Sequence, residues 1–202
     1  CHKVISTEQA VGVAALLAEY NGIDRYAHIQ EKLAWLAMHA QLVDAMSRAG
    51  CEHPDIFPDI GLAAPNMMYT NIAKYIFAHE QHEQSKLIAD IAGGVVTTVF
   101  NYRDWMNPEE RSLIEKYLAG KAGISTEHRL RALRMAKDLI GHGLDGAWIH
   151  TEGSLAAQKM SIYAAADWSK YKAIAKRMAG IPGWKEHPGL KELPDWPAKY
   201  II

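Results

Sequence analysis

Three things are scarce in this sequence: cysteine, net charge and long apolar runs. Its 202 residues include two cysteines, Cys1 and Cys51, and its charged side chains sum to −1 at pH 7. Two cysteines do not make the disulfide framework of a small secreted protein, so we expect a reduced, cytoplasmic setting. The near-zero net charge gives no electrostatic argument for nucleic acid or an anionic membrane surface. The longest apolar runs, 11–18 and 143–149, are far shorter than the roughly 20 residues of a membrane-spanning helix.

What remains is the composition of an ordinary globular protein. Apolar residues make up 49% of the chain and charged residues 22%, and the length allows one large domain with a buried core. The chain begins at Cys1 and not at a methionine. We therefore expect a fragment, a processed product or an incomplete sequence.

Helix signals recur along the chain, with almost no strand signal. Capping residues and three- or four-residue apolar spacings predict helices over about 6–21, 24–49, 66–93 (with a break near His79), 107–120, 125–141 and 154–179. Residues 50–65 hold three prolines and are expected to be irregular, and the β-prone run 95–100 has no partner and is expected to be an extended connector. The sequence predicts an all-α helical bundle over 1–180 and a proline- and tryptophan-containing tail over 181–202 that lies across another surface.

Four places could carry chemistry. The His79–Glu83 run has histidines three apart, which does not fit the metalloprotease spacing, and a solvated charged turn explains it better. Gly93-Gly94 could let a phosphate or a second backbone approach, but a helix C-cap explains it more simply. Glu152 is either a partly desolvated base or an acid favoured by a helix dipole. Cys1, His2 and Lys3 offer an incomplete ligand set for a metal or cluster, or an ordinary terminus.

Several short motifs, in order, resemble one family. They are Ala18-Glu-Tyr-Asn-Gly-Ile-Asp24, His28-Ile-Gln-Glu-Lys-Leu33, Asp90-Ile-Ala-Gly-Gly94, Glu115-Lys-Tyr-Leu118, Thr126-Glu-His-Arg-Leu-Arg-Ala-Leu-Arg134 and Thr151-Glu152. Together they resemble the C-terminal region of 4-hydroxybutyryl-CoA dehydratase, whose wider family includes the flavin-dependent 4-hydroxyphenylacetate 3-monooxygenases. The resemblance covers residues 1–181 or so, and the order and spacing of the motifs carry it.

The resemblance implies the C-terminal bundle of an acyl-CoA-dehydrogenase-like enzyme. Such enzymes are homotetramers that hold FAD between domains and subunits. The resemblance therefore favours a cofactor-binding role for Gly93-Gly94 over a plain helix C-cap. Asp90, Gly93 and Gly94 are then expected to approach the FAD of a neighbouring subunit. Glu152 is expected to be the catalytic carboxylate, and Lys3 matches an active-site lysine of the dehydratase. An acyl-CoA substrate is expected, and the N-terminal part of the enzyme, fused or as a separate subunit, is expected to complete the site.

The resemblance also has departures that leave alternatives open. The dehydratase holds a 4Fe-4S cluster through three cysteines and one histidine, and its last cysteine directly precedes the lysine. Here His2 precedes Lys3, and Cys1 lies one place earlier. Either Cys1 or His2 takes the ligand role, or the cluster is absent, as in a reduced-flavin aromatic monooxygenase. The family loop after Thr-Glu is shortened to Gly153-Ser154, which puts the dehydratase substrate pocket in doubt. A third possibility is a non-catalytic helical subunit that completes a partner's cofactor site.

Overall fold

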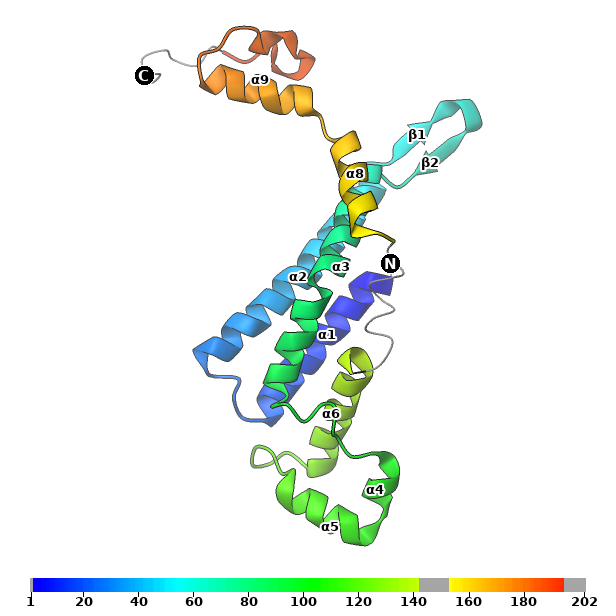
Figure 1. The fold of residues 1–202 in the computed structure, drawn as a ribbon, viewed down its shortest axis with the longest axis vertical. Coiled ribbons are helices and arrows are strands. Elements are labelled where there is room, and N and C mark those ends of the chain that lie inside the picture. Colours follow the sequence, from blue (N-terminus) through cyan, green and yellow to red (C-terminus); the bar gives the residue numbers. More distant parts are fainter. Residues whose placement is uncertain (1, 142–152, 195–202) are drawn as a thin grey trace. The chain divides into compact units, whose positions relative to one another are not determined.

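Four helices build the main bundle. The computed structural model describes residues 2–141 and 153–194. Helices α1 (His2–Tyr20), α2 (Ala27–Glu52), α3 (Met67–Ile91) and α6 (Thr126–Ile140) pack side by side, with α2 and α6 antiparallel to α1 and α3 (Figure 1). The all-α fold that the sequence predicted is therefore confirmed.

The core of this bundle follows the predicted helical spacing. On α1, the buried apolar positions fall three or four residues apart, so that one face of the helix is continuously covered. They meet buried residues of α3 and of α6. The buried side chains at this contact include Val13, Ala14, Leu17, Ile88, Ile91, Leu133 and Ala136.

Two short helices connect α3 to α6. Helix α4 (Tyr102–Met106) begins at a capping box in which Asn101 and Asp104 exchange hydrogen bonds, and α5 (Pro108–Tyr117) begins at the predicted Asn107 cap with Pro108 in its first turn. Trp105 joins the main core, and the guanidinium carbon of Arg111 lies 4.5 Å from the centre of its ring. Residues 95–100 form turns and irregular backbone, and no strand.

A β-hairpin lies between α2 and α3, in the segment that we expected to be irregular. Strands β1 (Asp55–Phe57) and β2 (Leu62–Ala64) pair antiparallel with Ile56 opposite Ala63, and the one-turn 3-10 helix η1 (Pro58–Ile60) joins them. Gly61 closes the turn at φ +63°, in the left-handed region that glycine tolerates. The sequence prediction was wrong here, because strands of three residues beside three prolines give too short an alternation to detect.

Several helix boundaries also differ from the sequence prediction. Helix α1 already begins at His2, so that Thr7 lies in its interior and its hydroxyl donates to the carbonyls of Lys3 and Val4. The N-cap of α2 is Tyr26 and not Asp24, and α3 runs without a break past His79. No helix among the described residues is long and apolar enough to cross a bilayer.

The C-terminal residues belong to a second compact unit, Tyr163–Ile202, separate from the first, Cys1–Ile162. The predicted single helix over 154–179 is instead α8 (Leu155–Ala165) and α9 (Trp168–Met178), because Asp167 caps a new helix. Within the second unit, η2 (Trp184–Glu186) and η3 (Pro188–Leu190) fold back on α9. Trp184, Leu190 and Ala173 form its small core, so the surface that this part of the tail covers belongs to its own unit.

Candidate functional site

Lys3 lies in the first turn of α1, and its side chain is directed into the bundle. It is 8% exposed, and its ammonium nitrogen lies 5.6 Å from the centre of the Phe77 ring on α3. The same nitrogen is 3.4 Å from Nε2 of His2, which itself is exposed. Burying a cation costs free energy, and the ring and the imidazole offset part of that cost.

Three polar side chains, one each on α1, α2 and α3, are also buried. His39 is 2% exposed, Gln81 2% and Thr7 0%. His39 lies beside Trp35, with 5.4 Å between the ring centres, and neither of its ring nitrogens makes a hydrogen bond within 3.5 Å. Burial lowers the pKa of His39 from its ordinary value of 6.5, although the Ile76 backbone and the Gln84 side chain partly oppose this. Burial therefore favours the neutral form of the imidazole.

The opposite end of α1 is fastened by a network of hydrogen bonds. The Asn21 amide nitrogen donates to the carbonyl of Ile91 at 2.9 Å, and its oxygen accepts from Nε of Arg129 at 2.8 Å. Arg129 also donates to the carbonyl of Leu118 at 2.8 Å. Gly120 packs directly against the backbone at the end of α1. A Cβ added to Gly120 would lie 2.4 Å from the carbonyl oxygen of Tyr20, so a larger residue would not fit without a shift. The ends of α1, α3 and α5 are thus locked together.

Asp90, Gly93 and Gly94 lie beside this network. Gly93 and Gly94 have φ values of 80° and 77°, and their amides donate to the carbonyls of Asp90 and Ala89, so the pair is a helix C-cap. Nothing lies within 4 Å of a Cβ added to either glycine. Asp90 forms an ion pair with Lys32. The glycine pair therefore offers an open backbone surface to a ligand, while its N–H groups are already used.

The two predicted parts of the site are far apart within one chain. Asn21, just after the end of α1, lies 18 positions beyond Lys3, which at a helical rise of 1.5 Å per residue is about 27 Å. Asn21 bonds directly to Ile91, next to the glycine pair. A hollow of about 440 Å³ at that end is lined by Asp90 and Gly93 with Lys121 and Arg129, and Lys3 does not line it.

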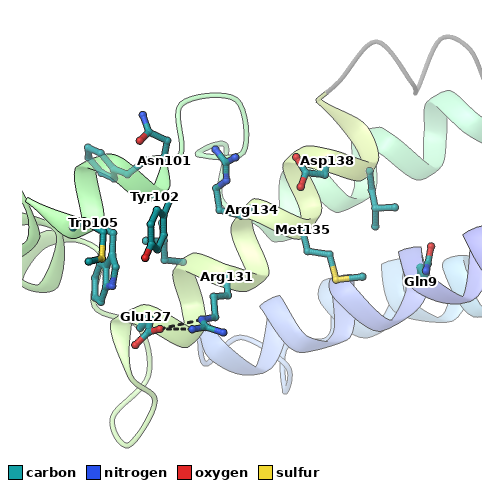
Figure 2. A pocket seen from close by; sticks show the side chains of 13 residues that line it. Gln9, Asn101, Tyr102, Trp105, Glu127, Arg131, Arg134, Met135 and Asp138 are labelled. Atoms are coloured by element: carbon teal, nitrogen blue, oxygen red, sulfur yellow. Dashed lines mark hydrogen bonds and ion pairs between the residues drawn. The ribbon is translucent and has the colours of Figure 1, made fainter.

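A larger groove, of about 730 Å³, runs along α6 and was not anticipated from the sequence. Figure 2 shows Tyr102 and Trp105 on its α4 wall and Arg131, Arg134, Met135 and Asp138 along α6. Glu127 accepts two hydrogen bonds from Arg131, at 2.6 and 3.1 Å. The periodic arginines at 131 and 134 were visible in the sequence, but the aromatic wall comes from a separate helix that only the fold brings alongside.

Residues 1–180 match the model of the 4-hydroxyphenylacetate 3-hydroxylase C-terminal (HpaB) family. The chain belongs to this family. It is 25% identical over 193 residues to the 4-hydroxybutyryl-CoA dehydratase/vinylacetyl-CoA Δ-isomerase of Clostridium aminobutyricum, covering 89% of this chain and 39% of that protein. It is 28% identical over 142 residues to the oxygenase component of 4-hydroxyphenylacetate 3-monooxygenase of Thermus thermophilus, covering 70% of this chain and 29% of that protein.

Solved structures of the HpaB family have the same fold. An oxygen-tolerant archaeal 4-hydroxybutyryl-CoA dehydratase from N. maritimus superposes with a TM-score of 0.78 at 29% identity, over 90% of this chain and 37% of that one. The oxygenase component of 4-hydroxyphenylacetate 3-monooxygenase, solved with FAD and 4-hydroxyphenylacetate, gives 0.78 at 23% identity, over 88% and 38%. The chain therefore spans less than two fifths of the length of these relatives.

Two of the residues expected to act in an HpaB-family site, Glu152 and Cys1, lie outside the described residues. Gly153, next to Glu152, has φ +78°, and the Ser154 hydroxyl accepts hydrogen bonds from the amides of Ala156 and Ala157 at the start of α8. Among residues 2–141 and 153–194, no group of three His, Cys, Asp or Glu side chains is placed to hold a metal ion. Cys51 is exposed. A 4Fe-4S cluster with three cysteines therefore cannot be built from this chain alone, which has two.

A serine, an aspartate and a histidine also meet in the second unit, without forming a catalytic triad. The Ser169 hydroxyl donates to Asp167 at 2.7 Å, and Nε2 of His187 lies 3.1 Å from the other Asp167 oxygen. Nδ1 of His187 accepts from the amide of Gly189, so this imidazole is not free to act as a base toward Ser169. Hydrogen bonds from Ser169 and from the Lys170 amide, helped by His187, lower the pKa of Asp167 to about 2. The cluster caps α9 and closes the unit.

Proposed function

We propose that this chain is the C-terminal helical part of a flavin-dependent enzyme that dehydrates a 4-hydroxyacyl-CoA. The chain aligns with the dehydratase over 193 residues and with the monooxygenase component over 142, and it is 29% identical to the solved archaeal dehydratase over the aligned part. Because the chain spans less than two fifths of these proteins, the remaining parts of the site come from other polypeptide segments.

The observation that carries this proposal is the burial of Lys3. Lysine is almost never fully buried without a specific partner, because its ammonium group loses its hydration. Here the ammonium group lies against the Phe77 ring at the first turn of α1, and Lys3 is 8% exposed. A positive charge held in a poorly hydrated place suits the stabilisation of a leaving hydroxyl group.

Glu152 and Lys3 have different catalytic roles in this proposal. Glu152 takes the proton from the carbon next to the thioester carbonyl, and Lys3 stabilises the hydroxyl group as it departs. FAD supplies the redox chemistry needed to remove the unactivated β-hydrogen when it is bound. Hydrogen bonds to the thioester carbonyl oxygen, from groups that other segments provide, stabilise the negative charge that develops there.

The glycine pair fits a role toward the flavin of another subunit. Gly93 and Gly94 leave open space where side chains would stand, and Lys121 and Arg129 add positive charge to the neighbouring hollow. The glycine pair and Lys3 lie at opposite ends of α1, about 27 Å apart. We therefore expect that a single flavin does not contact the glycine pair and Lys3 of the same chain. We therefore propose a homotetramer in which Lys3 and Glu152 serve one active site while Asp90, Gly93 and Gly94 serve a neighbouring one.

The proposal is tested on the complete enzyme with Glu152→Gln. This change keeps the size of the side chain and removes its basicity, so turnover of a 4-hydroxyacyl-CoA is expected to fall by about 10²- to 10⁴-fold. FAD content and the subunit assembly, measured by absorbance and by light scattering, are expected to stay unchanged. Undiminished turnover would remove Glu152 from the mechanism.

A reduced-flavin aromatic monooxygenase is the second candidate, favoured by the composition of the chain at Cys1, His2 and Lys3. The nearest cysteine to Lys3 is two residues before it, and the exposed Cys51 does not complete a ligand set. Iron and sulfide analysis of the complete enzyme separates the candidates. About four irons and four sulfides per subunit support the dehydratase, whereas an iron-free enzyme that hydroxylates a phenol supports the monooxygenase.

A non-catalytic helical subunit is the third candidate. In that case the chain supplies only an assembly surface or half of a cofactor site to a partner. The arrangement of the genes tests this candidate. A separate neighbouring reading frame for the N-terminal part supports it, and a single fused frame dismisses it.

A further inference from the structure

The β1–β2 hairpin presents large apolar side chains to solvent. It projects from the place where α2 ends and α3 begins (Figure 1), and no residue of either strand is buried. The strands and the turn between them carry four apolar side chains that are 46–72% exposed, here called the hairpin surface: Ile56, Phe57, Ile60 and Leu62. A two-stranded hairpin is marginally stable in water by itself, so this one needs a surface to pack against.

Helix α9 presents a second exposed apolar surface. Its Ala173 packs with Trp184 and Leu190 in the small core of its own unit. Away from that core, apolar side chains recur every three or four residues and are 38–57% exposed; they are here called the α9 face: Trp168, Tyr171, Ile174 and Met178. The centres of the Trp168 and Tyr171 rings are 5.9 Å apart. Tryptophan and tyrosine often carry the binding energy of protein interfaces, so the α9 face has the composition of one.

The hairpin surface lies in an acidic segment. Residues 52–65 contain three acidic side chains and no lysine or arginine. Asp55 is used inside the chain, where it accepts hydrogen bonds from the Asn66 side chain and the Met67 amide. Asp59, in the turn, is exposed and forms no ion pair with any residue that the structure describes. Its carboxylate is therefore available to a cation on another surface.

The α9 face is bordered by positive charge. Helix α9 carries three lysines and one arginine, and no acidic residue. Lys170 and Lys172 stand on either side of Tyr171, and at 3.6 residues per turn they flank the apolar stripe on its two sides. Neither lysine forms an ion pair within the described part of the chain. The α9 face and the hairpin surface are thus both apolar, and their borders carry opposite charges.

This complementarity points to a second copy of the chain as the occupant. Both surfaces remain exposed among the residues that the structure describes, and two hairpin surfaces placed together would repel through their carboxylates. Each chain carries one surface of each kind. Two copies related by a two-fold axis can therefore exchange them and cover all four surfaces at once.

We propose that the hairpin surface of each copy packs on the α9 face of a second copy, with Asp59 beside Lys170 and Lys172. This pairing rests on the proposed function only for the expectation that several copies assemble. It goes beyond that expectation because it assigns the contact and requires no particular cofactor or reaction.

Charge reversal on the complete protein tests the pairing. The hairpin variant is Asp59→Lys, and the α9 variant combines Lys170→Glu with Lys172→Glu. Each variant alone places like charges at both contacts, so we expect its subunit dissociation constant, measured by analytical ultracentrifugation, to rise by about 10- to 100-fold. The matched control is Glu8→Lys, an exposed reversal on α1 outside both surfaces, which should leave the dissociation constant unchanged.

Mixing the two variants shows which chains meet. In a mixed pair, the new lysine faces the new glutamates at one contact, and the native Asp59 faces the native lysines at the other. We therefore expect an equal mixture to regain wild-type assembly, with mixed oligomers dominant in native mass spectrometry. Rescue only when all three changes are on one chain would place the contact within a chain and overturn the proposal. Unaltered assembly of the separate variants would overturn it too.

The apolar part of the contact is tested separately. Ile60→Ser and Met178→Ser each remove an exposed side chain from one of the two surfaces and should raise the dissociation constant about 10-fold. Tyr117→Ser is the control, because Tyr117 is 74% exposed on α5 and belongs to neither surface. Equal dissociation constants in all three variants would contradict an apolar contact at these surfaces.

These outcomes separate the pairing from the proposed function. A complete protein that neither dehydrates a 4-hydroxyacyl-CoA nor hydroxylates a phenol, yet assembles from the two charge variants only when they are mixed, would overturn the proposed function alone. An active enzyme whose assembly responds to neither charge variant would overturn the pairing alone.

Discussion

At its C-terminal end, α1 is held to α3 and α5 through Asn21 and Arg129, and each of the hydrogen bonds that fasten it has both partners in this chain. At its N-terminal end, the Lys3 ammonium group is buried against an aromatic ring, and elsewhere in the bundle His39 is buried with neither ring nitrogen hydrogen-bonded. The first arrangement is what stability alone favours, because buried polar groups cost free energy when they lack partners. The second is costly for stability, and costs of that kind are typical of functional sites.

The largest expected effect is that of Lys3→Gln on catalysis by the complete enzyme. If the N-terminal end of α1 is functional, this change removes the buried charge and lowers turnover by about 10²- to 10³-fold. Steady-state kinetics measure it, with Lys86→Gln as the matched control because Lys86 is 72% exposed and, among the described residues, forms its ion pair with Glu83 on its own helix. Equal turnover in the two variants would mean that Lys3 is structural.

Arg129→Ala tests the hydrogen-bond network at the C-terminal end of α1. It leaves the Asn21 oxygen and the Leu118 carbonyl without their donors, and we expect the free energy of unfolding to fall by roughly 3 kcal/mol. Denaturant titration measures this change. The control is Arg48→Ala, which breaks an exposed pair with Asp44 and should cost no more than about 0.5 kcal/mol. A loss as small as that of the control would show that the network is not what fastens α1.

His39→Leu is expected to raise stability, because it removes an imidazole whose two nitrogens are buried without hydrogen bonds. The gain should be about 1 to 2 kcal/mol at pH 6 and smaller at pH 8.

The sign of this pH dependence follows from the lowered pKa of His39. Below pH 6.5 the unfolded chain binds a proton that the folded chain does not, so stability is lost as the pH falls from 6.5 toward the folded pKa. Thermal melts between pH 8 and 5 measure this slope in the wild type, and it should be shallower in His39→Leu. An unchanged slope would contradict the burial of a neutral imidazole.

Gly93→Ala has the smallest expected effect on stability. No atom lies within 4 Å of the added Cβ, so the cost is that of a left-handed conformation, about 1 kcal/mol. Gly12→Ala, in the interior of α1 and equally unobstructed, should instead stabilise by about 0.5 to 1 kcal/mol.

If Gly93 also faces a flavin, Gly93→Ala weakens FAD binding in the complete enzyme, and Gly12→Ala leaves it unchanged. Fluorescence titration of the apoenzyme measures both. Normal FAD affinity in Gly93→Ala would leave the glycine pair with its C-cap role alone.

Much of the helical framework could be predicted because its signals are local. Asn107 with Pro108, and Ser125 ahead of α6, begin helices where the sequence indicated, since a cap depends only on the next few residues. The hairpin over Asp55–Ala64 was missed, because strand pairing depends on a partner that lies outside any local window. The start of α1 was placed too late for a related reason: Ser6 and Thr7 form a good cap pattern, but their hydroxyls bond to carbonyls of the preceding turn.

The sequence by itself determined the fold class, the family and the identity of the candidate residues, because these follow from periodicity, caps and ordered motifs. The tertiary structure decided which of those residues meet. It placed Lys3 against Phe77, fastened Arg129 to Asn21 across 108 residues of sequence, and set the Tyr102 wall beside Arg134. Such encounters depend on how whole helices pack, and packing is fixed by the burial of apolar faces over the entire bundle rather than by any local run of residues.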